Sequence, residues 1–372
     1  MIWIVVIFNK MIVIDLGGMK NKRGISSYIN SIVSGLINGK DNPASHEKII
    51  LLAPRHISWS LCDDIISENI KVIFRPYFNQ IIWEIFLVPI YSKLLGATLI
   101  HYTGNTGGIL FPKLLNIPVV VTIHDVSFLK KSEVVPKPEL LRQKFGYLYR
   151  RYNTPKIARS AKKIITVSEF AKQDILLEIG VDNDKVVVIY NSLRNEFLME
   201  SKEVEKQKII LIVTGDGGQK NLDPTLKYLL ENKEELLGWL IMVVGVDGRE
   251  SSDFIKYIGR VEPVDLVKYY DMASILLMPS LYESFSIPII EALSRRTAVI
   301  ASNRGAVKEV LKGYGFTYDP TLRLDFIKII KKVKNNTQDK KNSSEKYAKS
   351  FLPEKLTQQT LAVYHRALFH ND

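Results

Sequence analysis

The sequence contains a single cysteine, Cys62, among its 372 residues. One thiol excludes an intramolecular disulfide framework and a metal site made only of cysteines, and it fits the reducing cytoplasm. The six histidines are scattered, and none has a metal-ligand spacing to Cys62 or to an acid. The only Asp-x-Asp pattern, Asp182 and Asp184, lies in an expected helix-to-strand connection. We therefore expect neither a metal nor another cofactor.

Long apolar runs are also missing. No stretch reaches the roughly 20 apolar residues that a membrane-spanning helix needs. The opening MIWIVVIFNK lacks a basic n-region and a small-residue cleavage site, which argues against a signal peptide. It is either an extra strand or sequence upstream of a start at Met11. We favour the second interpretation, because MIVIDL (11–16) is already typical of a first buried strand.

Positive charge is abundant and unevenly placed. The formal net charge is +12, and the window 130–163 contributes +9 of it, with eleven Lys or Arg against Glu133 and Glu139. Tyrosines alternate with Arg150 and Arg151 there, but no nucleic-acid-binding motif accompanies them, so nucleic acid is the least favoured partner. The window is either an anionic-membrane contact, which we favour, or a solvated helix face.

Short Val/Ile-rich runs alternate with helical stretches, which predicts an α/β protein with parallel strands buried on both faces. The runs lie at 11–16, 48–54, 72–74, 97–102, 118–125, 162–168, 185–191, 209–215, 240–245, 256–259, 275–280 and 297–302. A polar linker at 193–208 and the chain length divide them into two tandem halves. We expect Rossmann-like domains at 1–193 and 194–352, and a final helix within 353–372 that packs back on the first.

Ligands of open α/β sheets bind beyond the carboxyl ends of the strands. His124 and Asp125 directly follow VVVTI, so we expect His124 to face substrate. Gly17 and Gly18 open a glycine-rich turn after the first strand, which is a weak phosphate-cradle signal. The segment TGDGGQKN (214–221) is a stronger phosphate-binding signal, because its backbone amides and the cation Lys220 suit a phosphate group. The alternative is that it forms a plain βα turn. Its candidate residues are Thr214, Gly215, Lys220 and Asn221.

The segment PSLYESFSIPIIEALS (279–294) places two acids around the start of a helix that follows an apolar strand. Pro288 fits the first helical turn, where its missing N–H costs nothing. Glu283 is then expected on the loop and Glu291 on the helix, beside free N–H groups that attract an anion. A nucleotide-diphosphate sugar has a matching layout, with a charged centre between hydroxyl-bearing rings. The alternative is that the acids merely favour the helix dipole.

Five ordered blocks of the chain resemble the family 4 glycosyltransferases, which are retaining enzymes of the GT-B fold. The blocks are GISSYI, VVVTIHDVSFL, ITVSEFAKQDILLEIGVDNDKVVVIYNSL, TGDGGQKNL and the stretch from YIGRVEP to AVKEVL. The resemblance implies two Rossmann-like domains that face each other across a cleft, with the acceptor in the first and the nucleotide sugar in the second. It also points to enzymes of bacterial surface-polysaccharide or O-antigen biosynthesis.

The resemblance implies a role for each candidate residue. Glu283 would contact the transferred sugar, Glu291 the ribose, and His124 the sugar near the reacting carbon. Lys220 would neutralise the leaving diphosphate. The backbone amides around Phe285, Ser286 and Ile287 would hold sugar and phosphate, and Gly17 and Gly18 would let the first loop approach. Many relatives carry an Arg where this chain has Thr214, so Lys220 would act with Arg260 or with loop amides instead.

The implied reaction moves a hexose or deoxyhexose from a nucleotide-diphosphate sugar to a hydroxyl of a lipid-linked oligosaccharide, as in lipopolysaccharide biosynthesis. The segment 79–96 is an apolar helix that either lies against the membrane or packs in the core. With Asp125, Trp83, Arg150 and Arg151 it marks the expected acceptor or membrane side of a cytoplasmic, peripheral enzyme. A nucleotide-sugar epimerase of the same architecture and a non-catalytic nucleotide- or membrane-binding protein are the alternatives.

Overall fold

The structure, a computed structural model, describes residues 10–21, 24–38, 47–55, 67–130, 141–200, 204–215, 217–320, 326–333 and 338–369. Residues 1–9, Cys62 and the part of the basic window between 131 and 140 lie outside this range. The prediction about the start of the chain therefore stays untested. Of that opening stretch only Lys10 is described, and it begins the first strand.

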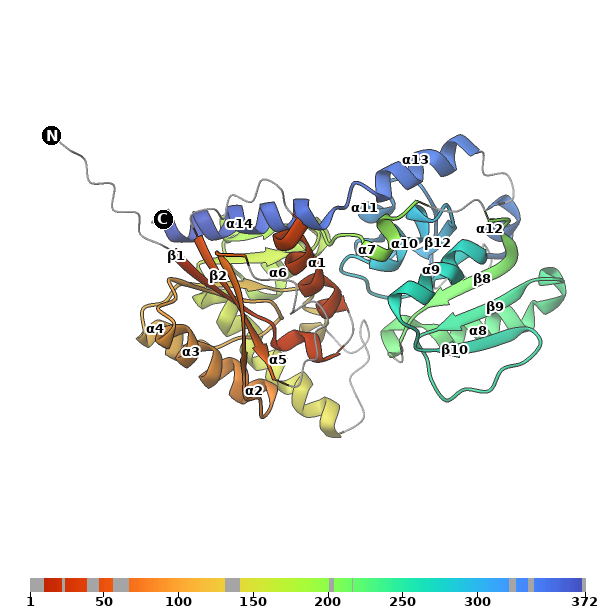
Figure 1. The fold of residues 1–372 in the computed structure, drawn as a ribbon. Helices are drawn as coiled ribbons and strands as arrows, with labels where there is room; N and C mark the ends of the chain where they lie inside the picture. Colours follow the sequence, from red (N-terminus) through yellow and green to blue (C-terminus); the bar gives the residue numbers. More distant parts are fainter. Residues whose placement is uncertain are drawn as a thin grey trace.

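The first half contains a parallel sheet of seven strands in the order β3-β2-β1-β4-β5-β6-β7, as far as the described residues show (Figure 1). Its strands are β1 (Lys10–Asp15), β2 (Glu47–Pro54), β3 (Ile70–Arg75), β4 (Leu99–Tyr102), β5 (Val119–Thr122), β6 (Lys163–Thr166) and β7 (Val186–Val188). Every pairing is parallel, so all carboxyl ends lie along one edge.

The second half contains a parallel sheet of six strands among the described residues, in the order β10-β9-β8-β11-β12-β13. Its strands are β8 (Gln207–Val213), β9 (Leu240–Val244), β10 (Ile255–Gly259), β11 (Ala273–Met278), β12 (Ala298–Ser302) and β13 (Phe316–Tyr318). β8 and β11 are neighbours, so the loops that follow them emerge side by side. The strand order reverses at this point, where α/β sheets bind their ligands.

Each predicted run overlaps a strand, so the predicted strands are confirmed, and the central strands of each sheet are buried on both faces. Ile12, Val13 and Ile14 are fully buried, and the same holds for Leu276 and Leu277 in the second half. β13 was not predicted. Its three residues are only half-buried at a sheet edge and lack a continuous apolar pattern.

Helices cover both sheets. In the first half they are η1 (Gly17–Asn21), α1 (Gly24–Asn38), α2 (Gln80–Ile82), η3 (Trp83–Leu87), α3 (Val88–Leu94), α4 (Leu110–Leu114), η4 (Ser127–Leu129), α5 (Leu141–Ser160), α6 (Glu169–Ile179) and η5 (Asn183–Lys185). In the linker and second half they are α7 (Asn195–Leu198), η6 (Gly218–Lys220), α8 (Leu222–Glu231), η7 (Lys233–Leu236), α9 (Pro263–Met272), α10 (Ile287–Ser294), α11 (Val307–Leu311), α12 (Phe326–Val333) and α13 (Gln338–Ala348). None of the helices in the described part of the chain has the length and low polarity that crossing a bilayer requires.

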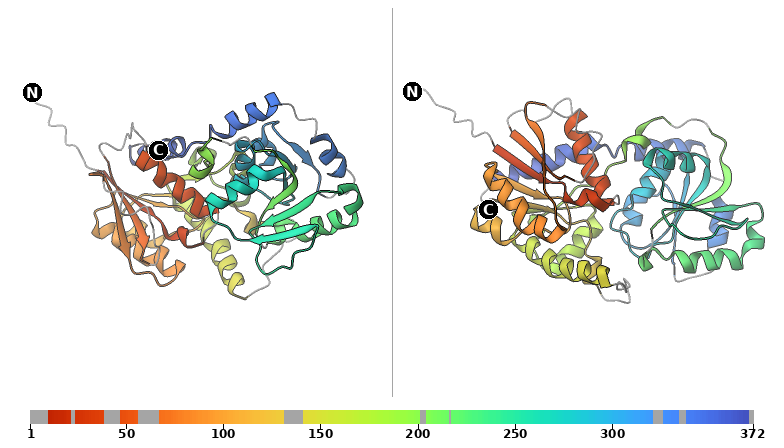
Figure 2. Two further views of the ribbon diagram at one scale, coloured as in Figure 1. Left: turned by 45° about the vertical axis from the view of Figure 1, so that its right-hand side comes forward. Right: turned by 60° about the horizontal axis from the view of Figure 1, so that its bottom comes forward.

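The final helix, α14 (Pro353–Phe369), leaves the second half and lies along α1 of the first (Figures 1 and 2). Thr357 Oγ1 donates to the carbonyl of Ile32 at 3.1 Å, and a Cβ on Gly35 would meet Thr357 Oγ1 at 2.2 Å. The hydroxyl of Tyr364 lies 2.6 Å from Nδ1 of buried His101. The expectation of a C-terminal helix that crosses back to the first domain is confirmed.

The expected apolar helix at 79–96 consists of three segments in direct succession. Between α2 and α3, the π-helical η3 makes a wider turn, in which the N–H of Val88 reaches the carbonyl of Trp83. Pro89 follows in the first turn of α3, where it needs no donor. π-Turns of this kind occur often beside functional sites.

Candidate functional site

Two loops of the second half meet at the carboxyl edge of its sheet. Nζ of Lys220, at the end of η6, lies 2.7 Å from Oε1 of Glu283. The loops are also joined through the backbone, since the N–H of Leu281 donates to the carbonyl of Gln219 at 2.8 Å. The side chain of Glu283 is only 10% exposed, against 31% for Lys220. The sequence assigned these two residues to one site, and the structure brings them into contact.

The helix α10 begins as the sequence predicts. Ile287 is its first residue and Pro288 lies in the first turn. The side chain of Phe285 is buried in the core, where its ring packs against Tyr190 and Phe351 at 5.8 and 6.0 Å between centroids. The aromatic ring thus anchors the loop that leads directly into the helix.

Thr214 and Gly215 directly follow β8 at the same edge. The N–H of Thr214 donates to the carbonyl of Val244, which extends the strand pairing by one residue. Asn221 follows η6 in a left-handed conformation, with φ of 53°, and donates to the carbonyl of Pro279 at 3.3 Å. Arg260, the alternative partner of Lys220, pairs instead with Asp247 at 3.1 Å on the exposed surface.

Glu291 lies in a buried polar network and not on an open surface. Its side chain is 1% exposed; Oε1 accepts from Nε of Arg194 at 2.5 Å, and Oε2 from the hydroxyl of Tyr270 at 3.1 Å. Both carboxylate oxygens therefore have protein partners. The predicted contact with ribose stays a prediction. It requires a carboxylate oxygen of Glu291 to accept an additional hydrogen bond or to give up one of its protein partners.

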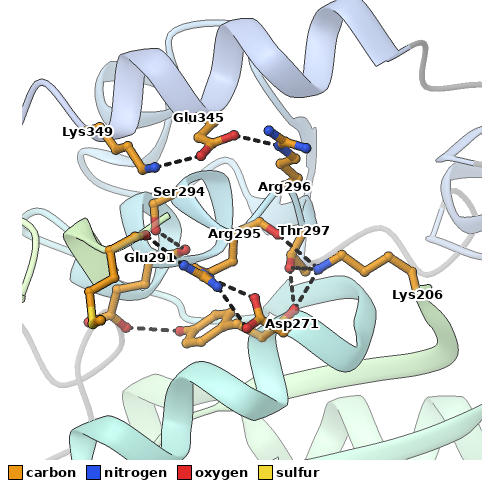
Figure 3. A network of polar contacts seen from close by, with 11 residues as sticks. Lys206, Asp271, Glu291, Ser294, Arg295, Arg296, Thr297, Glu345 and Lys349 are labelled. Carbon is orange, nitrogen blue, oxygen red and sulfur yellow. Dashed lines mark hydrogen bonds and ion pairs between the residues drawn. The ribbon is translucent and has the colours of Figure 1, made fainter. Parts of the chain in front are cut away.

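The network of Glu291 continues through charged neighbours (Figure 3). Arg295, which directly follows α10, makes two bonds to Asp271 at 2.7 and 2.8 Å. Nζ of Lys206 donates to Thr297 Oγ1 and to the carbonyls of Tyr270 and Arg295 at 2.8–2.9 Å. Burial lowers the pKa of Lys206 to about 7. These contacts fix the C-terminal end of α10 on α9.

His124 lies at the end of β5 in the first half. Its Nε2 is 2.9 Å from the carbonyl of Thr103, which can only accept, so Nε2 carries the proton. Tyr28 packs edge-on against the imidazole at 4.9 Å, and burial lowers the pKa of His124. The ring is therefore neutral at pH 7. Nδ1 has no partner among the described residues and is able to accept a hydrogen bond from a sugar hydroxyl.

Gly17 and Gly18 form the first βα turn, but one of the two amides is already hydrogen-bonded within the protein. The N–H of Gly17 donates to Oδ1 of Asp15 at 2.8 Å. A Cβ on Gly17 would lie 2.5 Å from Nε1 of Trp83, so glycine is required for this packing. The predicted approach of a diphosphate to this turn stays a prediction. The amide of Gly17 does not support it, because that N–H is bonded to Asp15.

The structure corrects the prediction for Trp83. Trp83 was expected to face the acceptor or the membrane, but it is completely buried and its Nε1 donates to Asp15 Oδ1 at 2.6 Å. The helix 80–94 is apolar on several sides, so its sequence did not reveal which face turns inward. Exposed residues of the same segment, such as Phe86 and Leu94, occupy the outer face instead.

Two buried acids beside Trp83 were missed. Asp15 and Glu84 are each 2% exposed. Glu84 accepts from Gln80 at 2.6 Å and Thr106 at 2.9 Å through Oε1, and from the hydroxyl of Tyr149 at 2.8 Å through Oε2. Burial raises the pKa of Asp15 to about 6; burial and the charge of Asp15 raise that of Glu84 to about 7. Asp15 directly ends the MIVID strand, which is the signal that could have identified it.

The remaining predicted residues lie on the surface of the first half. Oδ1 of Asp125 accepts from both the N–H and the hydroxyl of Ser127, which forms the turn after β5. Arg150 and Arg151 are exposed on α5, although Nη1 of Arg151 also donates to the carbonyl of Phe128 at 2.9 Å. Asp182 and Asp184 precede β7, at the amino end of the strand and away from the carboxyl edge.

The loop that carries Glu283 also joins the two halves. The hydroxyl of Ser168, which caps α6, donates to the carbonyl of Ser284 at 2.5 Å. The hydroxyl of Tyr282 donates to Asp174 of α6 at 2.7 Å. Glu309 of the second half accepts from the N–H groups of Glu169 and Phe170 at 2.8 and 3.1 Å. The Lys220–Glu283 site therefore lies next to the contact between the halves.

Comparison with known proteins identifies two matching family models. The one described as Glycosyltransferase Family 4 matches residues 54–196, and the one described as Glycosyl transferases group 1 matches residues 194–351. They adjoin one another in the same order as the two sheets.

Curated relatives include two mannosyltransferases. O-antigen chain mannosyltransferase B of Escherichia coli is 25% identical over 224 residues, which are 54% of this chain and 57% of the relative. O-antigen chain mannosyltransferase RfbU of Salmonella typhimurium is 28% identical over 217 residues, 54% of this chain and 56% of the relative. The chain thus spans about half the length of these relatives.

A solved structure of the same fold covers nearly the whole chain. The crystal structure of Anabaena Alr3699/HepE in complex with UDP and glucose has a TM-score of 0.67 to this chain, at 15% identity. The similarity covers 96% of this chain and 99% of that one. It shows that the two Rossmann-like halves form the GT-B fold.

Proposed function

Because this chain belongs to the family 4 glycosyltransferases, we propose that it transfers a hexose or deoxyhexose from a nucleotide-diphosphate sugar to a hydroxyl of a lipid-linked oligosaccharide. The observation that supports the donor site is the contact between Lys220 and Glu283 beside the N-terminus of α10. A cation and a helix N-terminus stabilise a diphosphate, while a carboxylate accepts bonds from sugar hydroxyls.

We propose retention of anomeric configuration without a covalent intermediate. A double displacement requires two carboxylates about 5 Å apart, as nucleophile and acid. Here Glu283 is bonded to Lys220, and Glu291 is buried against Arg194, so neither is placed as a free nucleophile. Instead the bond from the sugar to the diphosphate breaks, and the acceptor oxygen bonds to the same face of the sugar. Its proton passes to the leaving phosphate, whose charge Lys220 offsets.

The experiment for the donor is a thermal-shift panel of UDP-, GDP-, dTDP- and CMP-sugars. Mannose comes first, because the two O-antigen relatives are mannosyltransferases. The proposal predicts that one nucleotide family raises Tm and that the sugar is transferred only when a lipid-linked acceptor is added. Isomerised sugar formed from donor alone would identify an epimerase instead. No stabilisation by any nucleotide sugar would contradict the proposal.

We also propose that the first half docks on an anionic membrane, where such an acceptor would lie. The helices α2, η3, α3, α4 and α5 gather along the lower side of that half (Figure 1, and Figure 2, right), and rings of Phe86 and Phe111 pack at 5.4 Å between centroids. Large apolar side chains are exposed on these helices and at Phe78, two residues before α2. They are Phe78, Ile81, Ile82, Phe86, Ile90, Leu94, Leu110, Leu114, Phe145, Leu148 and Tyr152. We call these residues the apolar face.

Charge on these helices favours anionic lipid. Lys93, Lys113, Lys144, Arg150 and Lys156 are exposed beside the apolar face. The only acid in the sequence of the five helices is Glu84, and its side chain is buried. The apolar side chains would insert into the membrane interface, and the basic side chains would contact the anionic headgroups, so both would contribute to membrane binding. The location that follows is the inner face of the cell membrane.

Vesicle sedimentation tests the docking proposal. The double variant Phe145→Asp/Leu148→Asp should lose binding to vesicles that contain phosphatidylglycerol, because both side chains are more than half exposed on α5. Leu177→Asp is the matched control, since Leu177 is 79% exposed on α6, outside the apolar face. Equal sedimentation of the double variant and the wild-type protein would contradict docking through this face.

A further inference from the structure

Ser286, the residue before α10, has a backbone conformation that serine rarely adopts. Its φ is 81° and its ψ is 79°, in the region where only glycine avoids steric strain. Glycine would therefore be the less strained choice at the entry to this helix. Lys312, at the end of α11, offers a comparison, because it also has a positive φ, of 44°, but is exposed.

The hydroxyl of Ser286 has no hydrogen-bond partner in the part of the chain that the structure describes. The residue is 6% exposed, and Oγ is buried without a donor or acceptor among the described residues. A serine in this position usually accepts from an N–H two or three residues further on, but Ser286 makes no such capping bond. A buried, unpaired hydroxyl is unfavourable. One residue thus combines backbone strain with an unsatisfied polar group.

The surroundings of Ser286 indicate what would satisfy the hydroxyl. Ser286 lies three residues after Glu283, whose carboxylate contacts Lys220, and it borders the positive end of the α10 dipole. A second unpaired atom, Oδ1 of Asn303, belongs to the neighbouring loop after β12. That loop contacts this one directly, since the N–H of Ala306 donates to the carbonyl of Glu283 at 2.8 Å.

We propose that the hydroxyl of Ser286 donates a hydrogen bond to a phosphate oxygen of the nucleotide-diphosphate donor. The inference rests on the proposed function and adds a side-chain contact at the same site. Strain at a ligand-binding residue persists when the contact requires that residue. A glycine at position 286 would relieve the backbone strain but could not donate the hydrogen bond. A phosphate oxygen would accept the hydrogen bond that the hydroxyl of Ser286 does not make within the described protein.

Two substitutions separate the hydroxyl from the strain. Ser286→Ala keeps the Cβ and removes only the hydroxyl, so it should be at least as stable as the wild-type protein. Ser286→Gly removes both the hydroxyl and the backbone strain, and its Tm should rise by about 2–4 °C. Both should bind a nucleoside diphosphate about tenfold or more weakly, because a bond to a charged oxygen is lost. Affinity is measured by calorimetry with UDP, GDP and dTDP, each compared with its nucleoside.

Lys312→Gly is the matched control: it should raise Tm by a similar amount and leave nucleotide affinity unchanged. Lys220→Ala shows whether the site binds diphosphate at all. If Lys220→Ala loses affinity but Ser286→Ala does not, the Ser286 contact is wrong while the proposed function stands. If Ser286→Ala weakens only the complete nucleotide sugar and not the diphosphate, the phosphate assignment is wrong. If no nucleotide binds the wild-type protein, the proposed function fails, and the Ser286 contact with it.

Discussion

Lys220 Nζ and Glu283 Oε1 lie 2.7 Å apart, although 63 positions separate the residues in the sequence. Each residue follows one of two neighbouring strands, β8 and β11, so the order of the strands creates the contact. The pair combines a cation for phosphate with an acceptor for hydroxyl groups at one edge of the sheet.

Lys220→Ala should lower transfer by about 10²–10³-fold, because the charge that develops on the leaving diphosphate loses its cation. Initial rates at saturating donor measure the effect. Lys268→Ala is the control, since Lys268 pairs with Asp265 on the surface at 2.7 Å and lies outside the site. A rate for Lys220→Ala within threefold of the wild-type rate would show that Lys220 does not act on the leaving group.

Glu84→Gln should flatten the dependence of stability on pH. Burial raises the pKa of Glu84 from 4.5 to about 7, so the folded state binds this proton more tightly than the unfolded state. Stability therefore falls as pH rises from about 4.5 to 7, by an amount on the order of 3 kcal/mol. Glutamine resembles the protonated acid and can still accept from Gln80 and Thr106. Above pH 7 the variant should be the more stable protein.

Urea unfolding between pH 5 and pH 8 measures the Glu84 effect. Glu231→Gln, an exposed position at the end of α8, is the control and should follow the wild-type curve. Parallel curves for Glu84→Gln and the wild-type protein would show that the buried acid does not govern this pH range.

Arg194→Met should destabilise the fold by about 3–5 kcal/mol, because it leaves the buried carboxylate of Glu291 without its charge partner. Adding Glu291→Gln should restore part of the loss, since the buried charge is then gone. Arg260→Met is the matched control: its partner Asp247 is 57% exposed, and such pairs contribute less than about 1 kcal/mol. Additive effects of Arg194→Met and Glu291→Gln would indicate that the pair is not coupled.

Gly35→Ala should destabilise the protein by several kcal/mol. The new Cβ would lie 2.2 Å from Thr357 Oγ1 and 2.5 Å from the carbonyl oxygen of Pro353, so α14 would have to move. Adding Thr357→Ala should not restore stability, because the backbone clash with Pro353 remains. Gly24→Ala, in the same helix, meets no atom within 4 Å and serves as the control. Equal melting temperatures for the two glycine variants would contradict this packing.

Parallel strands and the polar residues at their ends could be predicted from the sequence because both signals are local. Continuous Val/Ile runs marked twelve of the strands among the described residues, and Lys220 and Glu283 were identified in the loops that follow two of these runs. The partners of Glu291 and Trp83 could not be predicted in this way. Arg194 and Asp15 reach them from distant segments, and neither contact leaves a spacing in the sequence.

Backbone conformation also escaped sequence reasoning. A serine before a helix is the ordinary capping residue, so nothing in ESFSIP indicated a positive φ or an unpaired hydroxyl at Ser286. Similarly, the lone acid in the segment 79–96 did not reveal its inward face, because an acid ordinarily lies on the exposed side, whereas Glu84 is buried and turns toward Tyr149.

The position of α14 sets the order in which the protein can be completed during synthesis. Leu356, Val363 and Tyr364 belong to the same core cluster as β1 and α1, so the first lobe contains both early and late residues of the chain. When only the first half of the chain has been synthesised, helix α1 still lacks the helix that packs on it, α14. Full assembly of that lobe must wait for the last helix, and loss of the C-terminus would damage the half of the molecule made first.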